Sequence, residues 1–170
     1  MSKIKLRQAK LKDFDGFLVE FTTDNDRATV VLGAAILDAL LVELIRKFLI
    51  DDPTHVDNLV EAERPLGSFG GRILLLYCLG ILDESHLRTF RLIKNMRNIF
   101  AHQLHGFTFE TPEIAELCLR LEIWNADRPA TISAKDQFTL AIFLLSGHLQ
   151  ELIDKTTHRE KPINQVAELI

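Results

Sequence analysis

Hydrophobic residues recur every three or four positions along most of this chain, a spacing that places them on one face of an α-helix. Between Leu11 and Phe21 the pattern predicts a first helix. The following run, residues 24–50, is apolar on nearly every side, so we expect it to form the central and most buried helix. No stretch shows a convincing pair of alternating strands, and the pattern therefore predicts an all-α protein.

Helix-breaking and helix-capping residues divide the rest of the chain. Asp51-Asp52-Pro53 ends the central helix, and residues 54–67 form a connection with room for one short helix. Gly80 is placed to end the next helix, and Thr111-Pro112-Glu113 is a start signal because a hydroxyl cap precedes a proline at the first helical position. The remaining predicted helices span residues 68–79, 84–103, 111–124 and 133–156.

The chain of 170 residues is long enough for one domain with a single core. Its 8 glycines and 5 prolines are few, which favours long regular elements. We therefore predict a single-domain helical bundle of five to seven helices over residues 1–157. Residues 158–170 are polar and include Pro162, so we expect them to form a loosely attached C-terminal tail.

Composition and charge indicate which partners and which cellular location to expect. The net charge of −4 argues against a large nonspecific DNA-binding surface, which needs an excess of lysine and arginine. The N-terminal lysines precede no apolar run, so we expect no signal peptide. The longest apolar stretches, Ala28–Leu37 and Phe138–Ser146, are too short to cross a bilayer, and we expect no membrane partner. Cys78 and Cys118 lie in apolar periodic segments and predict two buried free thiols in a cytoplasmic protein.

One charged residue interrupts the central apolar run. Asp38 needs a partner if it is buried, because an unpaired buried carboxylate is costly. We expect an ion pair with an arginine, either Arg72 or Arg97. The glycine-rich stretch from Gly67 to Gly71 precedes the helix that carries Arg72, and it either cradles an anion or forms a tight turn that allows close helix contact.

Three blocks of sequence follow one another over residues 20–105. They are Thr23–Ala28 with Gly33–Asp38; Pro65–Phe69 with Arg72, Leu76-Tyr77 and Leu79-Gly80; and Arg91–His102. Together they resemble the mannitol operon repressor family of bacteria. The chain departs from the family pattern at Gly70-Gly71, where other small residues are expected.

This resemblance implies an all-helical fold and, from the name of the family, control of a sugar-alcohol operon. The sequence has no helix-turn-helix pair with a basic recognition helix. We therefore expect a regulatory or interaction module, a homodimer, that works through protein partners and not through direct sequence-specific DNA binding. The candidate binding residues are Asp26, Arg27 and Arg72, although Asp26-Arg27 also suits a structural ion pair. A third interpretation is a ligand-sensing pocket near Arg27, Arg72 and Arg97.

The third block also resembles the motif of HEPN domains, in which an arginine, a polar residue and three variable residues precede a histidine. Arg97, Asn98 and His102 match it position by position. The match implies either a metal-independent, dimeric endoribonuclease or a binding module without activity. In a nuclease, His102 would take a proton from a ribose 2′-hydroxyl of RNA, Arg97 would stabilise the charge on the phosphate, and Asn98 would orient His102.

Helix geometry weighs against catalysis. Arg97 and His102 are about 140° apart around one helix, so the arginine must wrap around it or a two-fold axis must bring two copies together. In the structural interpretation, which we favour, Asn98 and His102 tie the helix end to neighbouring backbone. Arg97 then pairs with an acid such as Asp38 or Asp26.

We expect no metal site and no cofactor. His102 and His105 are close in sequence, but apart from Glu110 no acid or cysteine lies at a suitable spacing beside them. The other four histidines are scattered, and we expect most of them on helix surfaces: His55, His86, His148 and His158.

Overall fold

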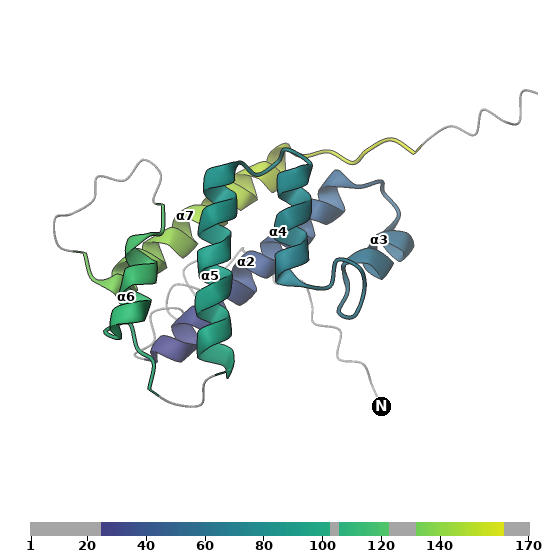
Figure 1. Ribbon diagram of the computed structural model, residues 1–170. Helices are drawn as coiled ribbons and strands as arrows, with labels where there is room; N and C mark the ends of the chain where they lie inside the picture. The colour runs from purple at the N-terminus through teal and green to yellow at the C-terminus, as the bar shows by residue number, and fades with distance from the viewer. Residues whose placement is uncertain (1–24, 103–105, 123–131, 162–170) are drawn as a thin grey trace, which may run out of the picture.

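The structure is a computed structural model that describes residues 25–102, 106–122 and 132–161, and these form a bundle of six α-helices without a β-strand (Figure 1). The prediction of an all-α fold is confirmed. The helix predicted over residues 11–21 lies outside the described residues. The helices are α2 (Asp26–Phe48), α3 (Pro53–Val60), α4 (Phe69–Cys78), α5 (Glu84–His102), α6 (Pro112–Leu119) and α7 (Ala134–Lys155).

Helix α2 is the centre of the bundle, as its dense apolar pattern predicts. Nine of its residues are buried, more than in any other described helix. The helix packs against α3, α4, α5 and α7, and in Figure 1 it runs behind α4 and α5. Its fully buried residues include Val30, Leu37, Leu41 and Leu44. Burial of each such side chain contributes about 1.5–3 kcal/mol, which makes α2 the main hydrophobic support of the fold.

The length of α2 corrects one expectation from the sequence. The helix has 23 residues with a mean hydropathy of 2.2 over its most apolar window, so by length and composition it could cross a membrane. In the sequence the apolar stretches are shorter because Asp38 and Glu43 interrupt the run. In the bundle half of the residues in this window are buried, and these belong to the core; the central helix of a globular protein has this same composition.

Side-chain caps fix where several helices begin. Asn25 is the N-cap of α2, and its side chain accepts a hydrogen bond from the amide of Ala28. Ser68 caps α4 through the amide of Gly71, and Ser133 caps α7 through the amide of Asp136, so both helices begin where the sequence predicts. Helix α6 begins at the expected proline but ends at Leu119, five residues earlier than predicted.

The connection after the central helix contains the short helix α3, which Asp52 caps through the amide of His55. Residues 156–161 run back across the end of α2. His158 and the amide of Arg159 both contact the carbonyl oxygen of Leu49, and the guanidinium of Arg159 lies 4.5 Å from the ring centre of Phe48. The division of the chain at residue 157 stays a prediction.

The two cysteines differ in environment, which corrects the expectation that both are buried. Cys118 is fully buried in the core, and its burial raises the pKa of the thiol to about 12. Cys78 is exposed. The apolar residues of α4 extend around the helix beyond the side that faces the core, so apolar spacing alone assigned Cys78 to the wrong side.

We expect one fast-reacting thiol in the native protein. A thiol-specific reagent should modify Cys78 within minutes at pH 8, because the thiolate is the reactive form and this thiol is exposed. Cys118 should react only after unfolding in guanidinium chloride. Thiol titration with and without denaturant measures both, and two fast equivalents in the native protein would contradict the burial of Cys118.

Candidate functional site

Arg72 is buried where α2, α4 and the connection after α3 meet. Only 6% of its surface is exposed. Its Nη1 donates to Oδ1 of Asp38 on α2 at 2.5 Å, its Nε donates to the carbonyl oxygen of Leu66 at 2.8 Å, and its Nη2 donates to that of Val60 at 2.7 Å. The expected pair of Asp38 with Arg72 is therefore present. Every nitrogen of the guanidinium is engaged within the protein, although the sequence analysis took Arg72 as a binding candidate.

The glycine-rich stretch before α4 forms a tight turn next to this arginine. A Cβ atom on Gly67 would lie 2.7 Å from the carbonyl oxygen of Glu61 and 3.0 Å from that of Arg64. Such contacts are too close for any other residue, so glycine lets the chain fold back on itself here. This geometry supports the tight-turn interpretation of residues 67–71.

Asp26 and Arg27 open α2 at the other end of the bundle. The carboxylate of Asp26 accepts a hydrogen bond from the amide of Phe109 at 3.0 Å and pairs with Lys135 of α7 at 3.1 Å. Asp26 thus joins the start of α2 to the 106–111 loop and to the start of α7. Arg27 is half-buried beside it. The two residues lie at the N-terminal end of α2, opposite the end that carries Arg46. They do not share a site with Arg72.

Arg97, Asn98 and His102 lie near the C-terminal end of α5. The side chains of Arg97 and His102 are exposed, and Asn98 is half-buried. The Nη1 atom of Arg97 donates to Oδ1 of Asn98 at 3.1 Å. Because Asn98 and His102 are four residues apart on the helix, this bond draws the guanidinium toward the face that carries His102. Arg97 therefore wraps around α5 in the direction that the 140° separation requires.

The ion pair expected for Arg97 is wrong. Asp38 binds Arg72 and Asp26 binds Lys135, so neither carboxylate is available to it. Arg72 of α4 takes the Asp38 carboxylate, and Asp26 faces α7. Among the described residues, Arg97 makes no ion pair.

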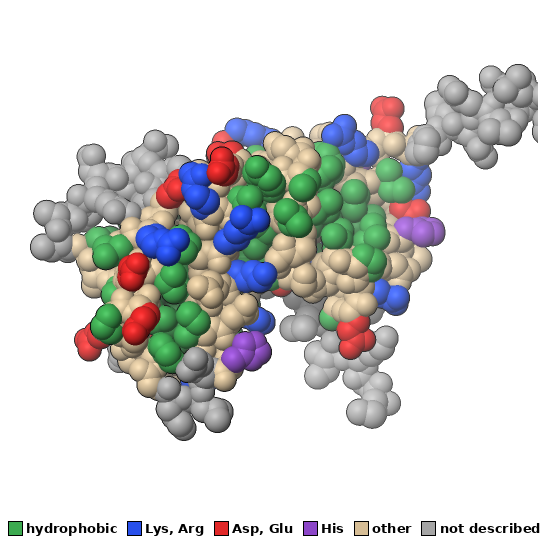
Figure 2. All heavy atoms as spheres, in the orientation of Figure 1, with side chains coloured by type: hydrophobic (Ala, Val, Ile, Leu, Met, Phe, Trp, Pro, Cys, Tyr) green, Lys and Arg blue, Asp and Glu red, His purple; other side chains and the backbone are tan. Residues whose placement is uncertain are grey.

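Helices α4 and α5 share an outer surface that the sequence did not predict. We define the α4–α5 surface by Leu74, Tyr77 and Cys78 of α4 together with Arg91, Lys94 and Arg97 of α5, all of them exposed. Figure 2 shows hydrophobic side chains over α4 and a row of Lys and Arg side chains along α5 beside them, with a histidine at the lower end of α5. The signal in the sequence was that Leu74 and Cys78 lie four residues apart on the side of α4 away from the buried Ile73 and Leu76, with Tyr77 at the edge of that side.

Lys94 joins the two helices of this surface. A Cβ atom on Gly70 would lie 2.7 Å from Nζ and 3.2 Å from Cε of Lys94, so the lysine side chain extends over the first turn of α4. Phe69 and Phe90 pack edge to face beneath it, with ring centres 6.2 Å apart. The cationic edge therefore lies against the start of α4, next to an aromatic contact between the two helices.

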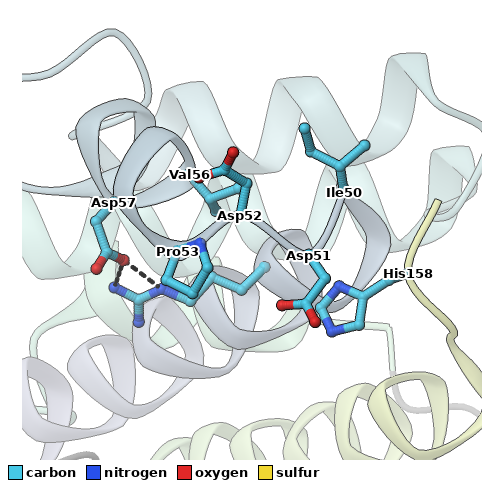
Figure 3. A pocket seen from close by; sticks show the side chains of 8 residues that line it. Ile50, Asp51, Asp52, Pro53, Val56, Asp57 and His158 are labelled. Atoms are coloured by element: carbon cyan, nitrogen blue, oxygen red, sulfur yellow. Dashed lines mark hydrogen bonds and ion pairs between the residues drawn. The ribbon is translucent and has the colours of Figure 1, made fainter. Parts of the chain in front are cut away.

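A small pocket of about 200 Å³ lies at the C-terminal end of α2, between the start of α3 and residue His158 (Figure 3). Arg46 donates to the carboxylate of Asp57 from both Nε and Nη2, at 3.1 and 2.7 Å. Hydrogen bonds from His55 hold the pKa of Asp52 below its usual range. Figure 3 shows the Asp51 carboxylate beside the ring of His158. The polar groups of the pocket largely satisfy one another, which makes it a weaker candidate than the α4–α5 surface.

Within residues 25–102, 106–122 and 132–161, no group of three or more His, Cys, Asp or Glu side chains is placed to hold a metal ion. His105 of the proposed pair with His102 lies outside these residues. The described histidines are dispersed, and His86 and His148 stack on each other with ring centres 4.5 Å apart between α5 and α7.

Comparisons with known proteins address the fold. No family model and no curated protein matches the chain. Among solved structures, the chain is similar to MtlR in an X-ray structure of the MtlR–HPr complex from Escherichia coli. The two share a TM-score of 0.65 and 15% sequence identity over 82% of this chain and 97% of that one. The similarity establishes an MtlR-like helical fold for this chain.

Two aspartate–arginine pairs among the described residues predict different costs of mutation. Asp38→Ala leaves the buried Arg72 without a counter-charge and should lower the free energy of unfolding by about 3 kcal/mol, the range for a broken buried pair. Asp57→Ala removes the partner of Arg46, whose side chain is 31% exposed, and should cost less than about 1 kcal/mol. Urea unfolding of both variants measures the contrast. Equal losses would contradict the structural role of Arg72.

Proposed function

We propose that this chain is a regulatory interaction module that acts by binding a protein partner in the cytoplasm. The observation that carries the proposal is the fold of the chain. This fold matches nearly the whole length of MtlR, a protein solved in complex with the protein HPr. The resemblance of residues 20–105 to the mannitol operon repressor family supports a role in the control of an operon. We further propose that the working form is a homodimer.

Surface chemistry also favours a protein partner over DNA. The net charge is −4, and the most basic helix face described, on α5, borders exposed Leu74 and Tyr77. A surface that reads DNA uses cations and polar groups against phosphates and base edges, whereas partly apolar patches are typical of protein interfaces. A mixed surface of this kind is suited to a regulator that acts on another protein.

The first test uses the HPr protein of the same organism. Titration calorimetry of the purified full chain with this HPr at physiological salt should show binding with a Kd in the micromolar range or tighter. The matched control titrates an operator-length DNA duplex and a shuffled duplex, for which we expect no sequence preference. Nanomolar binding to one duplex that a shuffled sequence abolishes, without any binding of HPr, would overturn the proposal.

A second candidate function is RNA cleavage. The observation that favours it is the hydrogen bond of Arg97 to Asn98, which brings an exposed cation toward the face of the exposed His102. His102 would act as general base on the 2′-hydroxyl and Arg97 would stabilise the phosphate, with no metal required.

If the chain cleaves RNA, His102→Ala should reduce the rate about 10²–10⁴-fold, since that is the usual contribution of general acid–base catalysis. Arg97→Ala should also lower it strongly, and a chelator should leave it unchanged. The melting temperature should stay the same, because both side chains are exposed. An RNA cleavage assay and a melting curve on the same preparations decide the matter: equal activity of wild type and His102→Ala assigns the cleavage to a contaminating nuclease and contradicts this mechanism.

A further inference from the structure

The outer side of α4 exposes several large apolar side chains. Leu74 is 50% exposed and Tyr77 is 37% exposed, and Leu79 just beyond the helix is 41% exposed. Residues 74 and 77 share one face, and Gly70 precedes them by one turn on the same face. Contiguous apolar residues of this kind, rimmed by charge, mark contact sites in soluble proteins.

Three cations of α5 lie along this apolar strip without a carboxylate partner. Arg91, Lys94 and Arg97 form no ion pair with the described residues, although acidic residues outnumber basic ones in the chain, 24 to 20. The contrast with Arg88, one turn earlier on α5, is direct. Arg88 pairs with Glu84 at 3.2 Å and with Glu122 at 2.9 Å.

The spacing of the cations suits a helical ligand. Arg91, Lys94 and Arg97 are three residues apart, so their Cα atoms rise about 4.5 Å at each step along α5. Carboxylates three or four residues apart on a partner helix are separated by about 4.5–6 Å along its axis. Each step also turns by about 60° around α5, so a helix that crosses α5 obliquely beside α4 can meet all three cations with one acidic edge.

We propose that the α4–α5 surface docks an amphipathic helix of a partner protein, one whose apolar stripe covers Leu74 and Tyr77 and whose glutamates or aspartates face Arg91, Lys94 and Arg97. The proposal rests on the function proposed above only in that the partner is a protein. Gly70 has no side chain of its own at the lower end of the surface, so the Lys94 side chain lies directly over the first turn of α4 and brings its ammonium group beside the apolar strip. Recognition of this type lays an apolar helix face in a groove and uses charges at the rim for orientation.

The test uses a synthetic helical peptide of about 18 residues with leucine at every third or fourth position and glutamate along one edge. A matched peptide carries glutamine in place of each glutamate. Fluorescence anisotropy with the full chain should give a Kd in the micromolar range for the acidic peptide and at least tenfold weaker binding for the glutamine peptide. Because exposed charge pairs are screened, the difference should shrink in about 0.5 M salt.

Cys78 provides a second readout without a mutation. It belongs to the proposed contact surface, and Cys118 is buried, so the rate of alkylation reports on Cys78 alone. A saturating amount of the acidic peptide should slow alkylation several-fold. An unchanged rate at saturation would place the peptide elsewhere and would overturn the proposal.

Variants locate the site on the protein. Leu74→Ser and the pair Arg91→Gln with Lys94→Gln should each weaken binding of the acidic peptide about tenfold or more. The matched controls are Leu119→Ser on α6, where the leucine is 60% exposed, and Lys47→Gln at the exposed end of α2. Neither control should change binding by more than twofold. Melting curves of all variants verify that the fold is intact.

Other occupants of the surface give distinct results. If sedimentation shows a dimer that Leu74→Ser dissociates, a second copy covers the surface and the proposal is wrong. If a single-stranded RNA binds more tightly than the peptide and Leu74→Ser leaves it unaffected, the cations serve a nucleic acid and the proposal is again wrong. Binding of HPr that none of these variants weakens, together with failure of the peptide, overturns this proposal and leaves the proposed function intact. Binding of the peptide without binding of HPr supports this proposal and excludes HPr as the partner.

Discussion

The contact between Arg72 and Asp38 is the constraint on which the arrangement of the helices depends. A buried guanidinium is tolerated because a carboxylate and three backbone carbonyl oxygens accept its hydrogen bonds, those of Val60, Leu66 and Gly67. One side chain therefore satisfies the polar groups of a tight connection and joins it to the central helix. Because Arg72 lies on α4, the same contact fixes how far α4 sits from α2, and consequently which of its residues face outward.

The outward face of α4 is a consequence of this anchoring. With Arg72, Ile73 and Leu76 directed to the core, Leu74 and Cys78 face the other way and Tyr77 lies at the edge of that side, beside the cations of α5. The structure thus places an apolar strip and a basic row next to each other on two helices that are held rigidly. A rigid surface pays little conformational entropy when a partner binds, which favours a docking role for it.

Much of the fold follows from the sequence because local rules and the apolar pattern agree. Spacing and the cost of burying charge predict the central helix, the start of α7 at Ser133, the proline start of α6 and the Asp38–Arg72 pair. The limits of helices were less predictable, as the early end of α6 shows. Cys78 was assigned to the core because a short helix with apolar residues on every side gives no clear period, and tertiary packing alone decides which side is buried.

The candidate site was less predictable than the fold. A motif such as Arg97, Asn98 and His102 specifies residue types, whereas the bond between Arg97 and Asn98 depends on a rotamer that no sequence rule supplies. The α4–α5 surface combines residues 74–78 with residues 91–97, and only the packing of the two helices brings them together. Asp26 was a binding candidate from its place at the start of α2, but its contacts with Phe109 and Lys135 arise from segments far along the chain.

Hydrogen–deuterium exchange of the wild type and Asp38→Ala tests the role of the buried arginine most directly. The account predicts that the amides of residues 60–67 and of α4 lose protection first in the variant, while those of α5 and α7 remain protected. Uniform loss of protection throughout the bundle, or no change in α4, would contradict the claim that this one contact holds the outer surface in place.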